Sequence, residues 1–486
     1  MITTTKFAFA LSIALLLADS PASAQQPPMD MSQEHTHHHA DIQPVAPVYP
    51  RFGRAQEAAQ DKLLTLDDAQ HLAAQSNPTL RQAEAEIRAA QARRQQSSLY
   101  PNPSLGYIGD EIRGGSVNGG KQGFFVQQNV VTAGKLSKSA KLFDQEIHLA
   151  EIEAQEQKLR VENAVKTAFY RVLAAQELLF ARRDLAQIDQ SYAQVRRELL
   201  NSGQADESEV LEAEVDAQRQ RLSVRMQENT LREEWKSLTA VIGQPDLPQS
   251  IVVGDLQQGW PDINEDQIIE LIAAQSPAAR IADSVAARAS AEIARAKSQA
   301  IPDLQLRGGL QYNNEPISPT HATGWEGLAE VTVEIPVFNR NQGNVAAASA
   351  DFGRAQLEKQ RIALTLRERA ATVLDEYANA KLMALQYRDE ILPRSEKAYT
   401  LLDQKYGLML ASYPRVLQAQ RKLFQLHTEY ISALENVWTT AISLQGFLLT
   451  DGLEAPARPG EIDRPIRETN LPMPERNPAF DPMPRP

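Results

Sequence analysis

Histidine is concentrated in one short segment near the start of the chain. Four of the eight histidines fall within five residues, and two methionines precede them. These residues are His35, His37, His38 and His39, with Met29 and Met31. Imidazole nitrogen binds Zn, Cu and Ni, and thioether sulfur binds Cu(I). The segment is therefore either a flexible metal-binding arm, with the four histidines as ligands, or a solvated low-complexity stretch that tolerates histidine.

No other group of residues has the spacing of a catalytic site. The chain has no glycine-rich phosphate loop, no HExxH motif and no nucleophile elbow, and without cysteine it has no thiol chemistry. Its carboxylates are spaced as on solvated helix faces. We therefore expect a protein that is not an enzyme and uses no cofactor. A net charge of -12 without a dominant basic patch argues against nucleic acid as a partner.

The first 24 residues are typical of a secretory signal peptide. Lys6 precedes an apolar core from Phe7 to Ala18, and Ala22-Ser23-Ala24 resembles a cleavage site. We expect this segment to be removed and the protein to leave the cytoplasm. No cysteine follows that could carry a lipid, so no lipid anchor is expected. No later run of eighteen apolar residues occurs, and the mean hydropathy is -0.40, so no membrane-spanning helix is expected.

One sequence plan occurs twice, about two hundred residues apart. Ala73-Ala74-Gln75-Ser76-Asn77-Pro78 matches Ala273-Ala274-Gln275-Ser276-Pro277. An apolar heptad series in the first copy consists of Val210, Ala217, Val224, Leu231 and Leu238. Adding 206 to each number gives Val416, Leu423, Tyr430, Val437 and Leu444. The chain therefore contains two copies of one unit, with helices whose seven-residue period favours left-handed supercoiling.

Turn and helix signals divide the chain into six parts. They are the signal peptide (1–24), a His/Pro-rich segment (25–61), the first repeat (62–245), a linker (246–262), the second repeat (263–452) and a Pro-rich disordered tail (453–486). The first repeat is predicted to contain strands at about 104–112 and 122–131 and long helices at 134–201 and 207–242. The second is predicted to contain strands at about 303–313 and 325–337 and helices at 343–410 and 415–450. Pro393 predicts a kink in the helix at 343–410.

The candidate strands have one apolar face and one polar face. The apolar series Trp325, Gly327, Ala329, Val331, Val333, Ile335 and Val337 alternates with residues that include three glutamates. Strands of about ten residues with this alternation are typical of outer-membrane barrels, and a half-buried soluble hairpin is the alternative. Four strands cannot close a barrel, and an open edge cannot lie in lipid. At least two chains must therefore combine their strands to close a barrel, and three chains are the preferred number.

The predicted fold class is therefore mainly α with a small β part, made of a duplicated unit. Each chain supplies four barrel strands, and its long coiled-coil helices continue the barrel as a helical tube. The heptads alone are also consistent with a solid coiled-coil rod.

Several motifs together resemble the TolC-type outer membrane factors. They are Leu64-Thr65-Leu66-Asp67-Asp68-Ala69 followed by Ser76-Asn77-Pro78, the duplication, and the turn at Gly203 that precedes Val210-Leu211. The resemblance covers about residues 62 to 452 and is nearest in style to the cobalt–zinc–cadmium and copper efflux branch. It implies a homotrimer with a twelve-stranded barrel in the outer membrane of a Gram-negative bacterium and an α-helical tunnel in the periplasm.

The resemblance also implies a function and partners. The implied function is the exit duct of a tripartite efflux system, which passively conducts substrate, here heavy-metal cations, out of the periplasm. The implied partners are outer-membrane lipid, a periplasmic adaptor (membrane fusion) protein and an inner-membrane pump of the resistance–nodulation–division type. Export of drugs, organic solutes or proteins through the same fold is an alternative. A periplasmic coiled-coil structural or adaptor protein is another, although an adaptor would have one hairpin flanked by compact β domains.

In the same family the turns between long helices form the periplasmic tip, where the adaptor docks. The corresponding residues here are Gly203, Gln204, Ala205 and Asp206 in the first copy and Gly407, Leu408, Met409 and Leu410 in the second. Met409 occupies the place of Gly203. Candidates for gating the tunnel mouth are Glu209, Glu212, Arg415 and Gln418. We hypothesise that Glu209 or Glu212 pairs with Arg415 and holds the tip shut.

Overall fold

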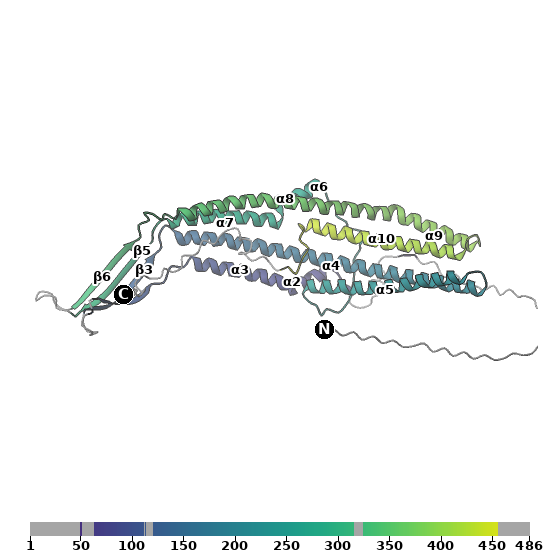
Figure 1. Ribbon diagram of the computed structural model, residues 1–486, viewed down its shortest axis with the longest axis horizontal. Helices are drawn as coiled ribbons and strands as arrows, with labels where there is room; N and C mark the ends of the chain where they lie inside the picture. The colour runs from purple at the N-terminus through teal and green to yellow at the C-terminus, as the bar shows by residue number, and fades with distance from the viewer. Residues whose placement is uncertain (1–48, 51–62, 111, 113–119, 315–323, 455–486) are drawn as a thin grey trace, which may run out of the picture. The chain divides into compact units, whose positions relative to one another are not determined.

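The computed structural model describes residues 49–50, 63–110, 112, 120–314 and 324–454 (Figure 1). All of them belong to one compact unit. The predicted signal peptide, the four clustered histidines and all of the Pro-rich tail beyond residue 454 lie outside the described residues. Within the described ranges, no helix is both long enough and apolar enough to cross a membrane.

The first repeat begins with two short helices whose ends are fixed by local capping. Its elements are α2 (Leu66–Ser76), α3 (Pro78–Ser97), β2 (Ser104–Asp110), β3 (Lys121–Val130), α4 (Lys135–Asn201) and α5 (Glu207–Ile242). The Thr65 hydroxyl accepts a hydrogen bond from the Asp68 N–H, and the Asp68 carboxylate accepts one from the Thr65 N–H. This reciprocal pair is a capping box. The Asn77 side chain caps α3 by accepting from the Thr79 N–H, with Pro78 at the first helical position.

The second repeat has the same order but an interrupted long helix. Its elements are α6 (Glu265–Gln275), α7 (Pro277–Gln299), β5 (Leu304–Asn313), β6 (Gly324–Val333), α8 (Gln342–Gln386), the π-helical turn η1 (Tyr387–Ile391), α9 (Leu392–Gly407) and α10 (Tyr413–Gln445). The helix predicted at 343–410, with a kink at Pro393, is thus divided by η1 just before that proline. Pro393 has no N–H to donate, and the Leu392 N–H bonds instead to the Tyr387 carbonyl.

Two further elements end earlier than the sequence suggested. The strand predicted at 325–337 stops at Val333, three residues before Pro336, which lacks a donor for a strand ladder. The helix predicted at 415–450 spans Tyr413–Gln445, because Phe447 and Leu448 adopt positive φ angles of 55° and 65°. An α-helix cannot continue through two successive residues in that region.

The four long strands form one antiparallel sheet that joins the repeats. Its order is β2-β3-β5-β6, and the central pairing runs from Lys121 opposite Asn313 to Val130 opposite Leu304. One face carries exposed apolar side chains, among them Leu105, Tyr107, Phe124, Val126, Leu310, Trp325 and Val331. A second, two-stranded parallel pairing connects β1 (Leu63–Leu64) with β4 (Ile251–Val252) and was not foreseen.

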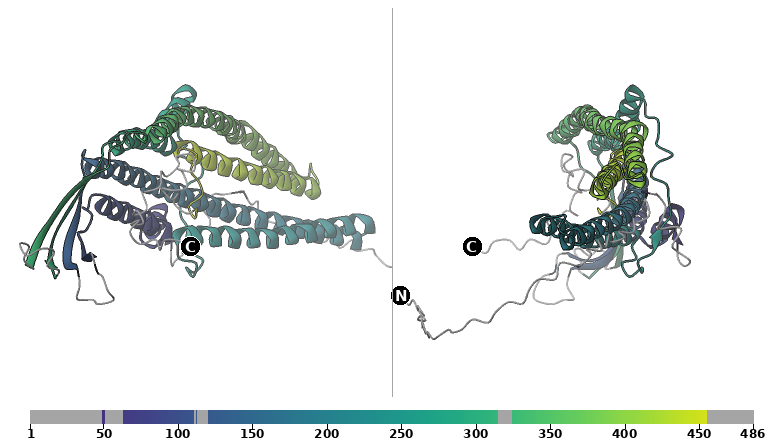
Figure 2. Two further views of the ribbon diagram at one scale, coloured as in Figure 1. Left: turned by 60° about the vertical axis from the view of Figure 1, so that its left-hand side comes forward. Right: turned by 90° about the vertical axis from the view of Figure 1, so that its right-hand side faces the viewer.

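The predicted heptad seam of the second return helix is confirmed by burial. Val416, Leu423, Tyr430, Val437 and Leu444 are each at most 3% exposed. In the first copy four of the five corresponding residues are buried and Val224 is half-buried. The long helix α4 packs against α3, α5, α7 and α10, so that both repeats share one apolar core (Figure 2).

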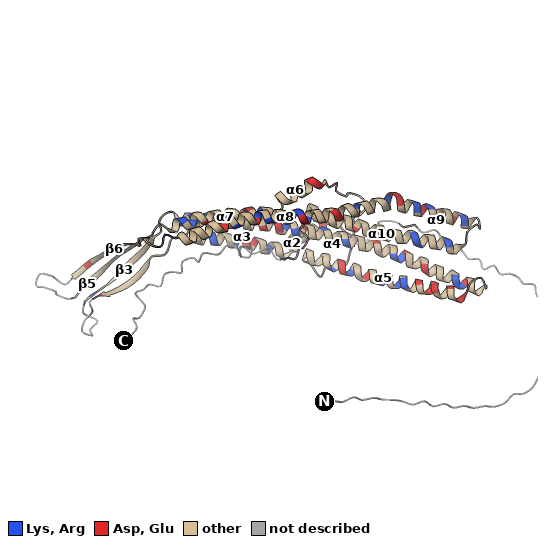
Figure 3. Ribbon diagram, turned by 45° about the horizontal axis from the view of Figure 1, so that its top comes forward, with Lys and Arg blue, Asp and Glu red and all other residues tan. Residues whose placement is uncertain are grey.

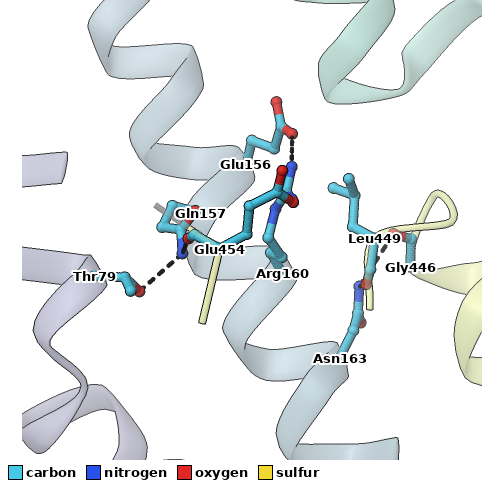
Figure 4. A network of polar contacts seen from close by, with 8 residues as sticks. All are labelled: Thr79, Glu156, Gln157, Arg160, Asn163, Gly446, Leu449 and Glu454. Carbon is cyan, nitrogen blue, oxygen red and sulfur yellow. Dashed lines mark hydrogen bonds and ion pairs between the residues drawn. The ribbon is translucent and has the colours of Figure 1, made fainter. Parts of the chain in front are cut away.

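A polar network fixes the chain that follows α10 against α4 (Figure 4). The Asn163 amide donates to the carbonyls of Gly446 (3.1 Å) and Leu449 (3.0 Å). The Gln157 amide donates to the Thr79 hydroxyl on α3 and to the Glu454 carbonyl. Arg160 pairs with the carboxylates of Glu156 and Glu454. The end of the second repeat is thereby held on the first.

Candidate functional site

The two helical hairpins end in turns of the same geometry at the end of the bundle that lies away from the sheet (Figure 1). In the first, Gly203 has a φ of +74° and the Gln204 N–H donates to the Leu199 carbonyl over 2.8 Å. In the second, Met409 has a φ of +59° and the Leu410 N–H donates to the Lys405 carbonyl over 2.8 Å. Both are Schellman-type helix ends. Only the first has the glycine that this conformation favours.

The second turn also exposes apolar side chains. Leu408, Met409 and Leu410 are 70%, 95% and 74% exposed. Three large apolar residues in succession on a turn are unusual for a surface that meets only water. The sequence-based assignment of both turns to adaptor docking stays a prediction.

The gating candidates are not joined in the way the sequence suggested. The Glu209 carboxylate binds Arg196 on its own hairpin, with a distance of 2.9 Å between Oε2 and Nη1. Arg196 also donates to the Tyr192 hydroxyl. Among the described residues of the single chain, no ion pair joins Glu209 or Glu212 to Arg415. Arg415 and Gln418 instead line an open groove on α10 of about 480 Å³.

An ion cluster around one buried carboxylate, which the sequence did not predict, connects the two hairpins. Arg421 on α10 contacts Asp189 on α4 (Nε to Oδ1, 2.6 Å) and Asp216 on α5 (Nη2 to Oδ2, 3.0 Å). Asp189 is only 1% exposed. Burial raises the pKa of the Asp189 carboxyl to about 6, Arg421 opposes that rise and Asp216 adds to it. The guanidinium therefore holds three helices of two repeats together.

The sequence contains a weak indication of this cluster. Asp189 lies three residues before Tyr192 of α4, which packs on a small apolar cluster between α4 and α5, and Arg421 lies two residues before Leu423 in the heptad seam of α10. Charged residues adjacent to both seams are candidates for contacts between helices. Their mutual distance is set by the approach of α10 to α4, which sequence spacing does not give.

The two hairpin ends carry opposite net charge (Figure 3). Residues 196–219 contain seven carboxylates and three cationic side chains, a net charge of -4. Residues 397–425 contain five cationic side chains and one carboxylate, a net charge of +4. The first hairpin end is therefore acidic and the second basic, which favours contact between hairpins of different type.

The sheet face opposite the apolar one is lined by paired charges. Lys121 binds Glu326 at 2.9 Å, and Glu326 also accepts hydrogen bonds from Gln311 and Asn313. The Arg307 guanidinium lies 3.9 Å from the centre of the Phe125 ring and pairs with Glu330 at 3.5 Å. This polar face suits the wall of an aqueous passage, whereas the other face suits lipid.

An antiparallel ribbon with these two faces, joined to duplicated long helical hairpins, is the fold of outer-membrane efflux ducts. The solved structure of CusC has this fold, with a TM-score of 0.64 and 18% identity over 79% of this chain and 91% of that one. Because the identity is low, this likeness concerns the fold alone.

The model of the outer membrane efflux protein family matches residues 69–244 of this chain. The cobalt-zinc-cadmium resistance protein CzcC of Cupriavidus metallidurans is 24% identical over 404 residues, covering 83% of this chain and 93% of the relative. The probable outer membrane lipoprotein SilC of Salmonella typhimurium is 24% identical over 284 residues, covering 55% of this chain and 58% of the relative.

Proposed function

We propose that this protein is the exit duct of a tripartite efflux system that carries heavy-metal cations out of the periplasm. The observation that carries the proposal is the sheet, which has an exposed apolar face, a face of paired charges and two edges without a neighbour among the described strands. Such a ribbon is stable in a membrane only as part of a closed wall around water.

The two open edges support a homotrimer. β2 and β6 are the outer strands of the sheet, and their outward backbone groups need partners in lipid. Three copies joined edge to edge bring together twelve strands, more than the roughly eight whose interior is just filled by side chains. The apolar side chains then face lipid, so the sheet attaches the protein to the outer membrane.

The hairpin turns are the proposed contact with a periplasmic adaptor. They lie at the far end of the helices from the sheet, and Leu408 to Leu410 expose apolar surface there. A duct has no energy source of its own. Transport is therefore driven by an inner-membrane pump, which we propose to be of the resistance–nodulation–division type.

Metal cations are the proposed substrate because of the named activity of the relatives. CzcC is a cobalt-zinc-cadmium resistance protein, and CusC of Escherichia coli, 23% identical over 440 residues, is a cation efflux system protein. Drugs or other organic solutes are the competing substrates. A strain that lacks the gene should become sensitive to zinc, cobalt, cadmium or copper and should recover when the gene is restored. Unchanged metal tolerance together with lost drug tolerance would overturn the metal assignment.

The histidine arm is a separate part of the proposal. His35, His37, His38 and His39 lie outside the described residues, and their chemistry favours binding of borderline cations. Replacing all four with alanine should weaken zinc or copper binding by the purified protein and lower resistance in cells. A matched variant carries four alanine replacements at neighbouring polar positions of the same segment. If the histidine variant equals this control in both assays, the arm has no role.

A further inference from the structure

A tyrosine that precedes the first repeat contacts the second helical hairpin. The Tyr49 ring meets the Tyr399 ring of α9 edge to face, with 5.4 Å between the ring centroids and 71° between the ring planes. The Tyr49 hydroxyl lies 3.5 Å from the hydroxyl of Thr400, and these two residues are 351 positions apart in the sequence. The contact therefore joins the start of the described chain to α9.

The surface that receives Tyr49 is rich in tyrosine. Tyr399 is 1% exposed and is the only buried residue of α9. Tyr406 and Tyr413, near the end of α9 and at the start of α10, have their ring centroids 5.2 Å apart. Burial raises the pKa of the Tyr399 hydroxyl, and Asp403, Tyr49 and Tyr413 raise it further. Tyr49 therefore helps to cover the one α9 side chain that is shielded from water.

This contact lies close to the hairpin turns. Tyr399 precedes Gly407, the last residue of α9, by eight positions, which is roughly 12 Å along the helix. β1 pairs with β4, whose Val252 carbonyl accepts a hydrogen bond from the Gln176 amide of α4. Gln176 precedes the end of α4 by 25 residues, which is roughly 38 Å. Tyr49 is therefore roughly 26 Å nearer to the turns than β1 is.

The chain that precedes Tyr49 is short enough to keep the clustered histidines near this contact. His39 precedes Tyr49 by ten residues and His35 by fourteen. An extended chain spans at most about 3.5 Å per residue, so the two histidines lie within roughly 35 Å and 50 Å of Tyr49. The helices from Gln342 to Gly407 measure roughly 100 Å. Attachment at Tyr49 therefore prevents the histidines from reaching the sheet.

We infer that Tyr49 anchors the histidine arm to the α9/α10 hairpin, so that a divalent cation bound by the arm is held at the hairpin end of the duct. This inference rests on the histidine arm of the proposed function and adds where on the duct the arm is held. Charge supports it, because the end of the first hairpin has a net charge of -4 and attracts cations. Tethering also raises the local concentration of the bound cation there.

Hydrogen exchange of the α9 amides tests the anchor itself. Tyr49→Ala should speed the exchange of amides 396–406 about fivefold, because one edge-to-face ring pair is lost. Tyr49→Phe keeps the ring pair and should retain most of the protection. Tyr100→Ala, which removes a tyrosine that is 65% exposed, is the control. If Y49A exchanges like Y100A, Tyr49 does not anchor the segment.

The placement of the arm is tested in the mature full-length protein in detergent, with copper(II) as the probe. The chain has no cysteine, so Q404C and Q360C can each carry a single fluorophore. Both glutamines are exposed, and they lie roughly 8 Å and 58 Å along the helices from Tyr399. Bound copper quenches only nearby fluorophores, so quenching should be stronger at position 404 than at 360. Adding Y49A, or alanine at all four clustered histidines, should remove this difference.

The possible results separate this inference from the proposed function. Bound copper with equal quenching at both positions would overturn the placement and leave the duct proposal standing. A parent protein that binds no more copper than the four-alanine variant would also overturn the inference, because no cation would then be held. Unchanged metal tolerance in a strain that lacks the gene would overturn the metal duct, whereas exchange of the α9 amides would still report the anchor.

Discussion

The two helical hairpins share a plan but differ in continuity. In the first, α4 runs for 67 residues without interruption and its turn has glycine at the left-handed position. In the second, a π turn divides the helix, methionine occupies the left-handed position, and Tyr399 is the only buried residue of α9. Local opening is easiest where buried contacts are few. The comparison indicates that the first hairpin is the scaffold and the second the more deformable element.

The largest expected effect comes from removing the cation that links the hairpins. Arg421→Ala leaves Asp189 buried without its partner, and breaking a buried ion pair in this way costs about 3 kcal/mol. Hydrogen exchange of the α9 and α10 amides measures the resulting local opening. The double variant R421M/D189N, which removes both charges, should recover most of the protection. If R421A exchanges like the parent protein, the cluster does not hold the hairpins together.

The same cluster predicts a pH dependence. The folded-state pKa of Asp189 is raised from 3.8 to about 6, so its contribution to stability is fully present below 3.8 and is lost as pH rises through 6. The loss caused by R421A should therefore be smaller at pH 5 than at pH 7.5. Asp189→Asn should remove this dependence over pH 4 to 6. A flat profile in the parent protein would contradict the burial of an ionisable carboxyl there.

The π turn gives a prediction of intermediate size. Pro393→Ala restores an N–H that can bond to the Asp389 carbonyl, which should convert the turn to regular α-helix. The gain is expected to be about 1 kcal/mol, below the roughly 3 kcal/mol that proline costs in an undistorted helix. Slower exchange of amides 387–396 would show it, with Pro414→Ala at the first turn of α10 as the control. Equal exchange would mean that tertiary packing, not proline, sets the π turn.

Replacing the residue with a positive φ should change the stability of the two turns in opposite directions. Gly203→Ala places a side chain at a φ of +74° and should destabilise the first turn by about 1 kcal/mol. Met409→Gly relieves the corresponding strain in the second turn and should stabilise it by a similar amount. The midpoint of thermal unfolding is measured for each variant and compared with that of the parent protein. Shifts of the same sign would contradict a shared turn geometry.

The smallest effect is expected at the exposed pair near the first turn. Glu209→Gln removes the charge that meets Arg196, and both side chains are partly solvated. Such pairs contribute about 0–1 kcal/mol, less at high salt. Unfolding in low and high salt tests this. A large loss in E209Q would show that Glu209 contacts another chain in the assembly.

Much of the architecture follows from local pattern. The capping residues Thr65 and Asn77 and the alternation of the strands are visible in the sequence because each depends on neighbours only a few positions away. The heptad series of α10 is equally visible in the sequence, and its residues are buried in the structure. The contacts at the candidate site could be predicted less well from the sequence. The partner of Glu209 depends on how the helices pack, so the matching positions of Glu209 and Arg415 in the two repeats did not predict its ion pair with Arg196.

The sequence by itself determined the repeat, the period of each element and the sign of the net charge at each hairpin end, because these can be read from the residues in order along the chain. Tertiary structure decided that Asp189 is buried under Arg421, that Leu63–Leu64 pairs with Ile251–Val252, and that a π turn rather than a simple bend precedes Pro393. The first two features join segments that are far apart in the sequence. The third depends on which of two competing backbone hydrogen bonds is more stable, and that is decided only when the helices are in contact.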